Sequence, residues 1–145
     1  MMTRNRERGS ALVEAAVVTP ILLLLMVGIF EVGRAYETWQ VLTNAAREGA
    51  RVSVLPNSDT DTTEALVRQY MSDGQLSRAG DAPVEVDKNA SLTVNGTTFG
   101  ASLVTVDYPF QFMVLQPVAN MVVPGTNTGE AITMRATALM RNESQ

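Results

Sequence analysis

The most pronounced pattern in the sequence is a long apolar run close to its start. Between residues 11 and 30 only Glu14 carries a formal charge, and residues 21–27 show no polar face. A helix of that length, at about 1.5 Å per residue, covers roughly the 30 Å hydrocarbon core of a bilayer. The core helix of a soluble domain would show a polar side. The pattern therefore predicts a membrane-spanning helix over residues 10–30.

Helical periodicity continues past the apolar run. Apolar and small residues recur at alternating spacings of three and four, which is typical of one face of an amphipathic helix. We expect the spanning helix to extend through residues 31–55 and to end before Pro56, because the residue preceding a proline disfavours the α conformation. Trp39 fits either this face or an anchor at the membrane interface. The face consists of Val32, Ala35, Trp39, Leu42, Ala46 and Gly49.

A polar stretch then leads into a second predicted helix. Asp61, followed three residues later by Glu64, is typical of a capping box at a helix start. The helix should run to about Met71, and Asp73 and Gly74 should close it. Its predicted apolar side consists of Ala65, Leu66 and Tyr70, with Val67 at the margin.

Beyond Pro83 the apolar residues follow a two-residue period, which indicates half-buried strands. The pair Asn95-Gly96 predicts a hairpin turn, and Pro109 fits an edge or a bulge. Residues 115–129 are interpreted as a loop with a short apolar segment at 118–123. The predicted strands cover residues 84–86, 91–94, 103–112 and 131–140.

One apolar face per strand favours an antiparallel sheet buried on one side. The predicted fold class is therefore α+β: a long N-terminal transmembrane and amphipathic helix packed on a small antiparallel sheet, with one short extra helix. The predicted domains are a basic leader (1–9), the transmembrane helix (10–30), its amphipathic extension (31–55) and an extracytoplasmic α+β domain (56–145).

Basic residues precede the apolar run. Arg4, Arg6 and Arg8 stand against Glu7, and basic residues that flank a span tend to remain in the cytoplasm. The N-terminus is therefore predicted inside the cell, and the chain from Glu31 onward outside it.

A secretory signal peptide shares this charged start and apolar centre. Three features argue against it: the apolar run is about twice the usual length of a signal core, no small-x-small cleavage site follows Phe30, and Glu14 lies inside the run. An ionisable residue within a span is a functional hypothesis by default. The alternative for Glu14 is a structural one, since a negative charge is favourable in the first turn of a helix.

The composition excludes several function classes. The chain has no His and no Cys, which removes the usual general base, the thiol nucleophile, most zinc sites and any disulfide. The net charge of −4 and the single lysine, Lys88, argue against a nucleic-acid surface. Asn57, Asp59 and Asp61 alternate like calcium ligands, but Arg68 stands where such a loop needs glutamate. We therefore predict no enzyme, no cofactor and no metal site.

The N-terminal residues resemble a known family. A basic leader, a glycine, a small residue and a glutamate inside an apolar helix are the pattern of type IV prepilins. More narrowly, residues 6–52 are similar to TadE-like proteins, the minor pilin or pseudopilin components of Tad (tight-adherence) pili, and the run from Gly129 to Arg141 is similar to the family's last strand. The matching positions are residues 6–14, Thr19, Pro20, Gly28, Glu31, Gly33, Arg34 and residues 45–51.

This resemblance implies processing and assembly. A prepilin peptidase would cut between Gly9 and Ser10 on the cytoplasmic side, and the new amine at Ser10 would pair with Glu14, usually that of a neighbouring subunit. A glycine also lets the protease approach the backbone closely. Pro20 lies inside the helix, where a proline tends to produce a kink, although it could equally be tolerated without a role.

The predicted function is accordingly that of a pilin-like structural subunit of a Tad/Flp-type pilus. The partners implied are other pilin and pseudopilin subunits, the prepilin peptidase, the inner-membrane assembly platform and the membrane itself. The implied location is the bacterial inner membrane, as a single-pass protein, and then the pilus or the cell-surface face. The alternative is an uncleaved, single-pass, membrane-anchored binding module.

Overall fold

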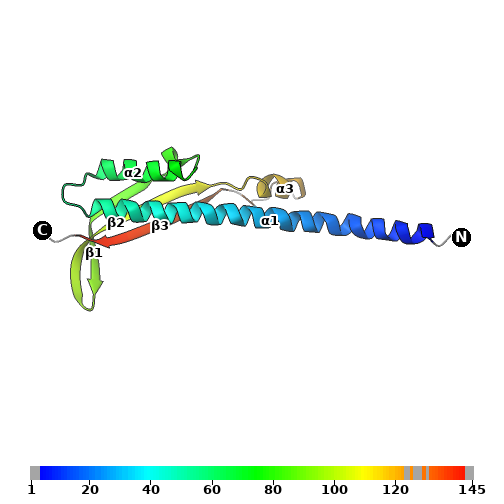
Figure 1. The fold of residues 1–145 in the computed structure, drawn as a ribbon, viewed down its shortest axis with the longest axis horizontal. Coiled ribbons are helices and arrows are strands. Elements are labelled where there is room, and N and C mark those ends of the chain that lie inside the picture. The colour runs from blue at the N-terminus through cyan, green and yellow to red at the C-terminus, as the bar shows by residue number, and fades with distance from the viewer. Residues whose placement is uncertain (1–3, 123–124, 126–128, 130, 143–145) are drawn as a thin grey trace. The chain divides into compact units, whose positions relative to one another are not determined.

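The computed structural model describes residues 4–122, 125, 129 and 131–142. Residues 1–3 of the predicted leader and Val123 of the predicted apolar segment lie outside them. The elements are α1 (Arg4–Ser53), α2 (Thr60–Asp73), the 3₁₀ turn η1 (Ala79–Asp81), β1 (Val84–Val94), β2 (Thr97–Phe110), α3 (Leu115–Val122) and β3 (Ile132–Arg141) (Figure 1). A long apolar N-terminal helix, an antiparallel sheet of three strands and shorter helices confirm the predicted α+β class.

The chain forms two compact units. The first contains Met1–Arg34 and Phe112–Glu130, and the second contains Ala35–Gln111 and Ala131–Gln145. Helix α1 is shared by both units, and it ends at Ser53, before Pro56, as predicted. The Ser53 hydroxyl donates a hydrogen bond to the Ala50 carbonyl over 2.8 Å within this last turn.

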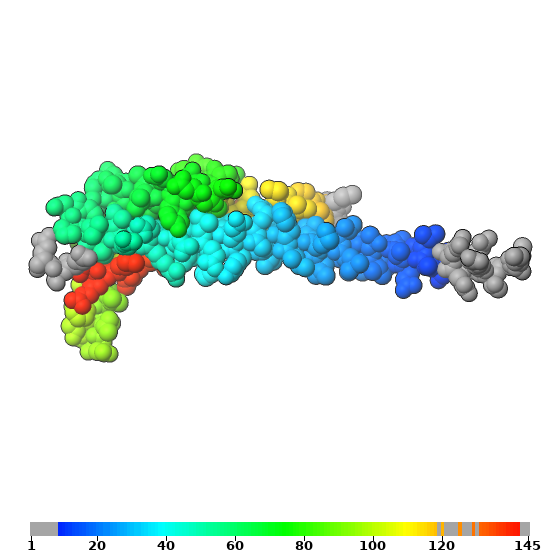
Figure 2. Space-filling model, viewed as in Figure 1, coloured from blue at the N-terminus to red at the C-terminus, as the bar shows by residue number. Residues whose placement is uncertain are grey.

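In the first unit, the apolar part of α1 is exposed along its length. Leu22, Leu23 and Leu24 expose 56 %, 55 % and 53 % of their surface. The face seen in Figure 2 shows this part of α1 uncovered as far as α3. Among the described residues, α1 is the helix that is long and apolar enough to cross a membrane.

In the second unit, α1 packs against α2 and the sheet. Leu42, Ala46 and Gly49 are buried, as predicted, Ala35 is half-buried, and Trp39 is 47 % exposed. Val32, the member of the predicted face that belongs to the first unit, is 68 % exposed. The buried face is rotated toward small residues because these let the partner elements approach the helix. It consists of Thr38, Leu42, Ala45, Ala46, Gly49 and Ala50.

Helix α2 begins earlier than its sequence signal. Its N-cap residue is Asp59, whose side chain makes no capping hydrogen bond, so the predicted capping box of Asp61 and Glu64 is wrong. Glu64 instead forms an ion pair of 3.0 Å with Arg68, one turn further on, which is a favourable helical spacing. The helix ends at Asp73 and is capped by Gly74, as predicted, and the Gly74 N–H donates to the Tyr70 carbonyl.

The buried side of α2 also differs from the predicted one. Thr63, Val67 and Met71 are buried, whereas Ala65 and Tyr70 are exposed. Thr63 can be buried because its hydroxyl donates to the Asp59 carbonyl over 2.9 Å. A polar residue whose side chain forms its hydrogen bond within its own helix can thus occupy a core position.

The sheet has the order β1-β2-β3, with both pairs antiparallel. The turn between β1 and β2 is formed by Asn95 and Gly96, with φ of 51° and 79°, which is the geometry predicted for this pair. The two short strands predicted at 84–86 and 91–94 are one strand. A register shift between Asp87 and Ala90 separates them, and the Asn89 N–H donates to the Asp87 carboxylate there.

The central strand β2 supplies the buried face. Val104, Val106, Tyr108 and Phe110 are buried, as the two-residue period predicted. Pro109 lies past the last residue of β2 that pairs with β1. The Asp107 N–H points toward the β1 side of β2 and donates to the Pro83 carbonyl. The backbone nitrogen of Pro109, two residues later, points toward the same side. Its missing N–H therefore falls at an edge, as predicted.

The loop predicted from residue 115 onward is wrong over residues 115–122, which form the helix α3. Sequence patterning missed this helix because it is short, has a proline at its third position and depends on a contact with a residue that is distant in the sequence.

Gly49 gives a direct test of the packing in the second unit. A Cβ atom there would lie 2.4 Å from Val67 Cγ2 and 3.3 Å from Val104 Cγ1, and both valines have stiff side chains. We expect Gly49→Ala to destabilise this unit by about 1–3 kcal/mol, as measured by thermal unfolding in detergent followed by circular dichroism. Gly33→Ala is the matched control, since a Cβ there meets nothing within 4 Å; equal stability of the two variants would contradict the packing.

A cross-strand ion pair joins β2 to β3. Asp107 and Arg135 are register partners, and the guanidinium donates from Nε and Nη2 to the two carboxylate oxygens over 2.7 Å each. The hydrogen bond from Arg135 lowers the pKa of Asp107 below its usual value.

Because the carboxylate is favoured in the folded state, its contribution to stability is present above the unfolded pKa near ~3.9 and is lost as the pH falls through the lower folded value. We expect Asp107→Asn to lower the unfolding temperature at pH 7 and to make little difference at the acid end of a pH series. A difference that stays constant over the whole series would rule out an ionic origin.

Candidate functional site on the N-terminal helix

The residues predicted to matter for processing and assembly lie on one face of α1. Gly9, Ser10 and Glu14 border a shallow groove along the helix, whose other lining residues are Val13, Val17 and Val18. Residues four apart on a helix are surface neighbours, with Cβ atoms about 6 Å from each other. The fold therefore brings Ser10 next to Glu14.

This face is open and apolar apart from Glu14. Residues 9–20 are exposed, and a Cβ atom at Gly9 would meet nothing within 4 Å. The groove side chains around Glu14 offer no positive charge to its carboxylate. Within an apolar environment, such an acid requires a partner from elsewhere.

Pro20 lies inside α1, and the helix continues on both sides of it. A proline has no N–H, so the carbonyl of Ala16, four residues earlier, lacks its usual helical donor. Pro20 is outside the Gly9–Glu14 groove. Its role as a kink stays a prediction.

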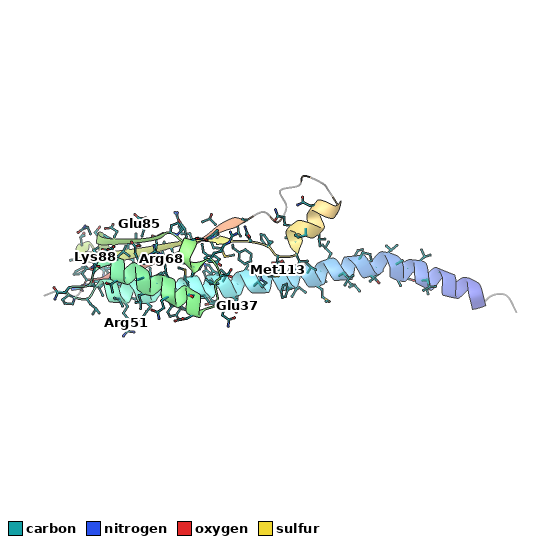
Figure 3. All side chains as sticks on the ribbon, turned by 90° about the horizontal axis from the view of Figure 1, so that it is seen from above. Glu37, Arg51, Arg68, Glu85, Lys88 and Met113 are labelled. Atoms are coloured by element: carbon teal, nitrogen blue, oxygen red, sulfur yellow. The ribbon has the colours of Figure 1, made fainter. Side chains whose placement is uncertain are left out.

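A second acid, Glu31, has a contact that the sequence analysis did not foresee. Its side chain is 1 % exposed, although it directly follows the apolar run. Its carboxylate accepts hydrogen bonds from the Met113 N–H over 2.8 Å, from the Val114 N–H over 2.6 Å and from Arg34 Nη1 over 2.8 Å. Figure 3 shows Met113 beside α1.

These bonds explain why α3 starts where it does. The first N–H groups of a helix have no partner inside it, and Glu31 accepts from the two that precede Leu115. Pro117, at the third position, needs no acceptor and is tolerated in a first turn. The Val118 N–H then donates to the Val114 carbonyl over 3.1 Å. Glu31 thus acts as an N-terminal cap supplied from another helix.

Gly129 lies against the same helix start. A Cβ atom there would be 2.7 Å from Gln116 N and 2.9 Å from Gln116 Cα, and the residue has a φ of 81°. Both the close approach and the positive φ favour glycine. The one sequence signal for this cluster was an acid three residues before Arg34 at the end of the apolar run, because such a spacing allows an ion pair.

Among the described residues, no group of three or more Asp, Glu, His or Cys side chains could hold a metal ion.

The described residues combine one N-terminal helix that is long and apolar enough to cross a membrane with a small α+β unit. Residues 9–51 match the family model described as "TadE-like protein", which confirms the resemblance found in the N-terminal residues. TadE-like proteins are pilin-like structural components associated with Tad pili, and they are not a family of enzymes. No curated protein and no solved structure matches the chain.

The matched segment lies within α1. It starts at Gly9 and ends at Arg51, two residues before the helix ends. Glu14, Pro20 and Glu31 therefore all fall inside it. The family match and the apolar helix fit a membrane-anchored protein.

The cap on α3 can be tested by hydrogen exchange. In Glu31→Ala the N–H groups of Met113 and Val114 lose their acceptor, which typically costs about 1–3 kcal/mol for a buried group. We expect deuterium uptake over residues 113–118 to become roughly tenfold faster or more, as measured by mass spectrometry. Glu37→Ala, at an exposed position of the same helix, should leave this uptake unchanged, and equal uptake in both variants would contradict the cap.

Proposed function

We propose that this chain is a structural, non-enzymatic subunit of a Tad-type pilus. It is cut after Gly9 by a prepilin peptidase and is assembled through α1 into the filament or its tip. The observation that carries this proposal is the exposed apolar helix with one acid, Glu14, four residues after Ser10, in a segment that matches the TadE-like model.

The proposed membrane arrangement follows the charge distribution. The basic leader, residues 1–9, lies in the cytoplasm, residues 10–30 cross the inner membrane, and residues 31–55 extend the helix beyond it. Residues 56–145 contribute the extracytoplasmic part. Exposed leucines along α1 support the crossing, because lipid or neighbouring apolar helices are the surroundings in which such a surface is stable.

Cleavage requires the peptide bond after Gly9 to leave the helical conformation so that a protease can bind it. Glycine in a helix interior is about 0.5–1 kcal/mol less favourable than alanine, so local opening is easier at this residue. Gly9 also has open space around it, which lets a peptidase reach the backbone.

Cleavage would supply a cationic partner to Glu14, whose described groove neighbours carry no positive charge. The new amine at Ser10 is cationic, with an ordinary pKa near ~8, and an opposite charge within ~4–6 Å favours the ionised form of each group. A lone acid at the centre of a bilayer is unfavourable by about 2.5–3.5 kcal/mol on insertion scales. Pairing between Glu14 and the amine of a neighbouring subunit removes two such charges from the filament core at once.

Pro20 is proposed to act within the same assembly. A kink at this position changes the direction of the helix between the pairing end and the rest of the span. The freed Ala16 carbonyl can then be satisfied by neighbouring helices, as in other membrane bundles.

The first prediction concerns the mature N-terminus. Intact-mass analysis of the protein from the native membrane fraction should give a chain beginning at Ser10, and Gly9→Val should block the cut because a β-branched side chain hinders close approach. A chain that still begins at Met1 or Met2 would support the uncleaved binding module instead.

The second prediction concerns assembly. Glu14→Ala should insert into the membrane and be cut normally, but it should be lost from sheared pili by at least tenfold, as quantified by immunoblotting. Glu37→Ala is the matched control on the exposed surface of the same helix and should be incorporated as the wild type is. Normal incorporation of Glu14→Ala would refute the proposed pairing.

A further inference from the structure

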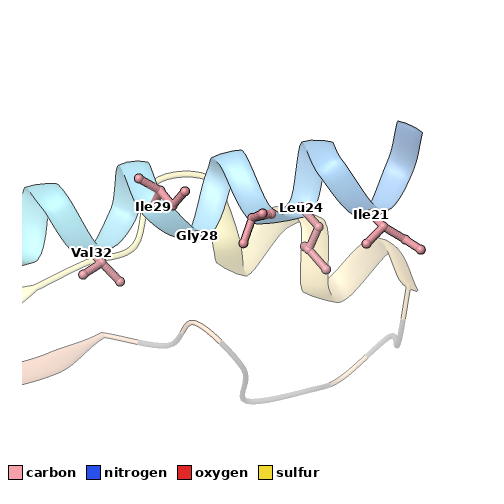
Figure 4. A pocket seen from close by; sticks show the side chains of 6 residues that line it. Ile21, Leu24, Gly28, Ile29 and Val32 are labelled. Carbon is pink, nitrogen blue, oxygen red and sulfur yellow. The ribbon is translucent and has the colours of Figure 1, made fainter. Parts of the chain in front are cut away.

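A second uncharged segment of the chain lies beside the apolar part of α1. No residue from Tyr108 to Gly129 carries a formal charge, and α3 falls within this stretch. Residues Phe112–Glu130 form one compact unit with Met1–Arg34. Figure 4 shows α3 running alongside the part of α1 between Ile29 and Ile21, and Figures 1 and 3 agree with this placement.

The direction of α3 is important for its environment. Its start is held at Glu31, at the end of the apolar run. From there it passes back along α1 toward Ile21 (Figure 4). If residues 10–30 cross a bilayer, α3 lies at the same depth as Ile21–Ile29, and not in the water beyond the span.

We propose that residues 112–122 form a re-entrant element, which enters the membrane leaflet next to Glu31 and contacts lipid acyl chains. This proposal rests on the proposed membrane crossing by α1. It adds a second membrane-embedded element, in a part of the chain that the family match does not cover.

The start of this element fits a site without water. In hydrocarbon, every backbone polar group needs a partner within the protein. The N–H groups of Met113 and Val114 have Glu31 as their acceptor, and Pro117 has no N–H to satisfy. Glu31 itself is neutralised by Arg34 at 2.8 Å.

The side chains fit the same surroundings. Between residues 112 and 122 the polar side chains are those of Gln116 and Asn120, both uncharged amides. Met113 at the start of the element is 63 % exposed and adds apolar surface next to the span.

Lipid is the occupant that the neighbouring surface indicates. A shallow apolar groove runs along α1 beside α3 (Figure 4) and is continuous with the exposed apolar surface of the span. The acyl chains that surround the span therefore cover this groove and α3 as well. The groove is lined by Ile21, Leu24, Leu25, Gly28, Ile29 and Val32.

The chain has no cysteine, so a single spin label can be placed anywhere in the full-length protein. We would compare Val118→Cys in α3 with Leu23→Cys in the span and Gln69→Cys in α2. Each labelled protein is reconstituted in phosphatidylcholine vesicles. Relaxation by oxygen, which concentrates in lipid, is then measured against relaxation by a water-soluble nickel chelate.

The expected result is that the label at residue 118 behaves like the label at residue 23, with at least a threefold higher ratio of oxygen to nickel accessibility than the label at residue 69. In a second variant, Glu31→Gln should shift the residue 118 label toward water, whereas Glu37→Gln should not.

The outcomes separate this inference from the proposed function. If residue 23 reports lipid and residue 118 reports water, the re-entrant element is wrong and the span stands. If both report water, the proposed crossing itself fails. If residue 118 is shielded from both reagents, protein covers α3, as a second copy would, and lipid contact is refuted. The measurement on the chain with native Glu31 decides the matter even if Glu31→Gln does not fold.

Discussion

The rest of the structure depends on the apolar surface that α1 leaves uncovered. Leu12, Ile21 and Met26 expose 71 %, 64 % and 68 % of their surface, although such side chains normally drive folding by becoming buried. Each square ångström of this surface is worth about 25 cal/mol when it is removed from water. The chain therefore has a strong driving force to enter a membrane or to pack with other helices, and its charged residues are arranged around that requirement.

Two glutamates at opposite ends of the apolar run differ in how their negative charge is compensated. Glu31 finds three donors within its own chain and is buried. Glu14, of the same chemistry, lies in a groove lined otherwise by apolar and small residues. The fold provides a complete set of partners for Glu31, whereas the described side chains in the groove of Glu14 provide no positive charge, which fits an acid that pairs with a group supplied by processing or by a neighbour. This contrast is the strongest structural support for a role of Glu14 in assembly.

The sequence predicted those features that depend on neighbouring residues. The continuation of α1 beyond the apolar run, its end before Pro56 and the turn at Asn95-Gly96 follow from local periodicity and backbone preferences, and the structure confirms them. The helix begins earlier than predicted, at Arg4 and not at residue 10. What was missed depends on partners distant in sequence. The cap on α3 joins residues 82 positions apart. The buried side of α2 is determined by the packing of Val67 against Gly49 of α1. No local pattern carries that information.

The pairing of Phe110 with Ile132 brings the ends of β2 and β3 together. The chain thus leaves the second unit and returns to it at adjacent points of one sheet. A recombinant version cut before Ala35 would keep the segment between these strands, which is uncharged as far as Gly129, but would lose the Glu31 that caps α3, and it should aggregate. Replacing residues 111–131 by a two-residue reverse turn would close the ladder instead, which offers a route to a water-soluble form of this unit.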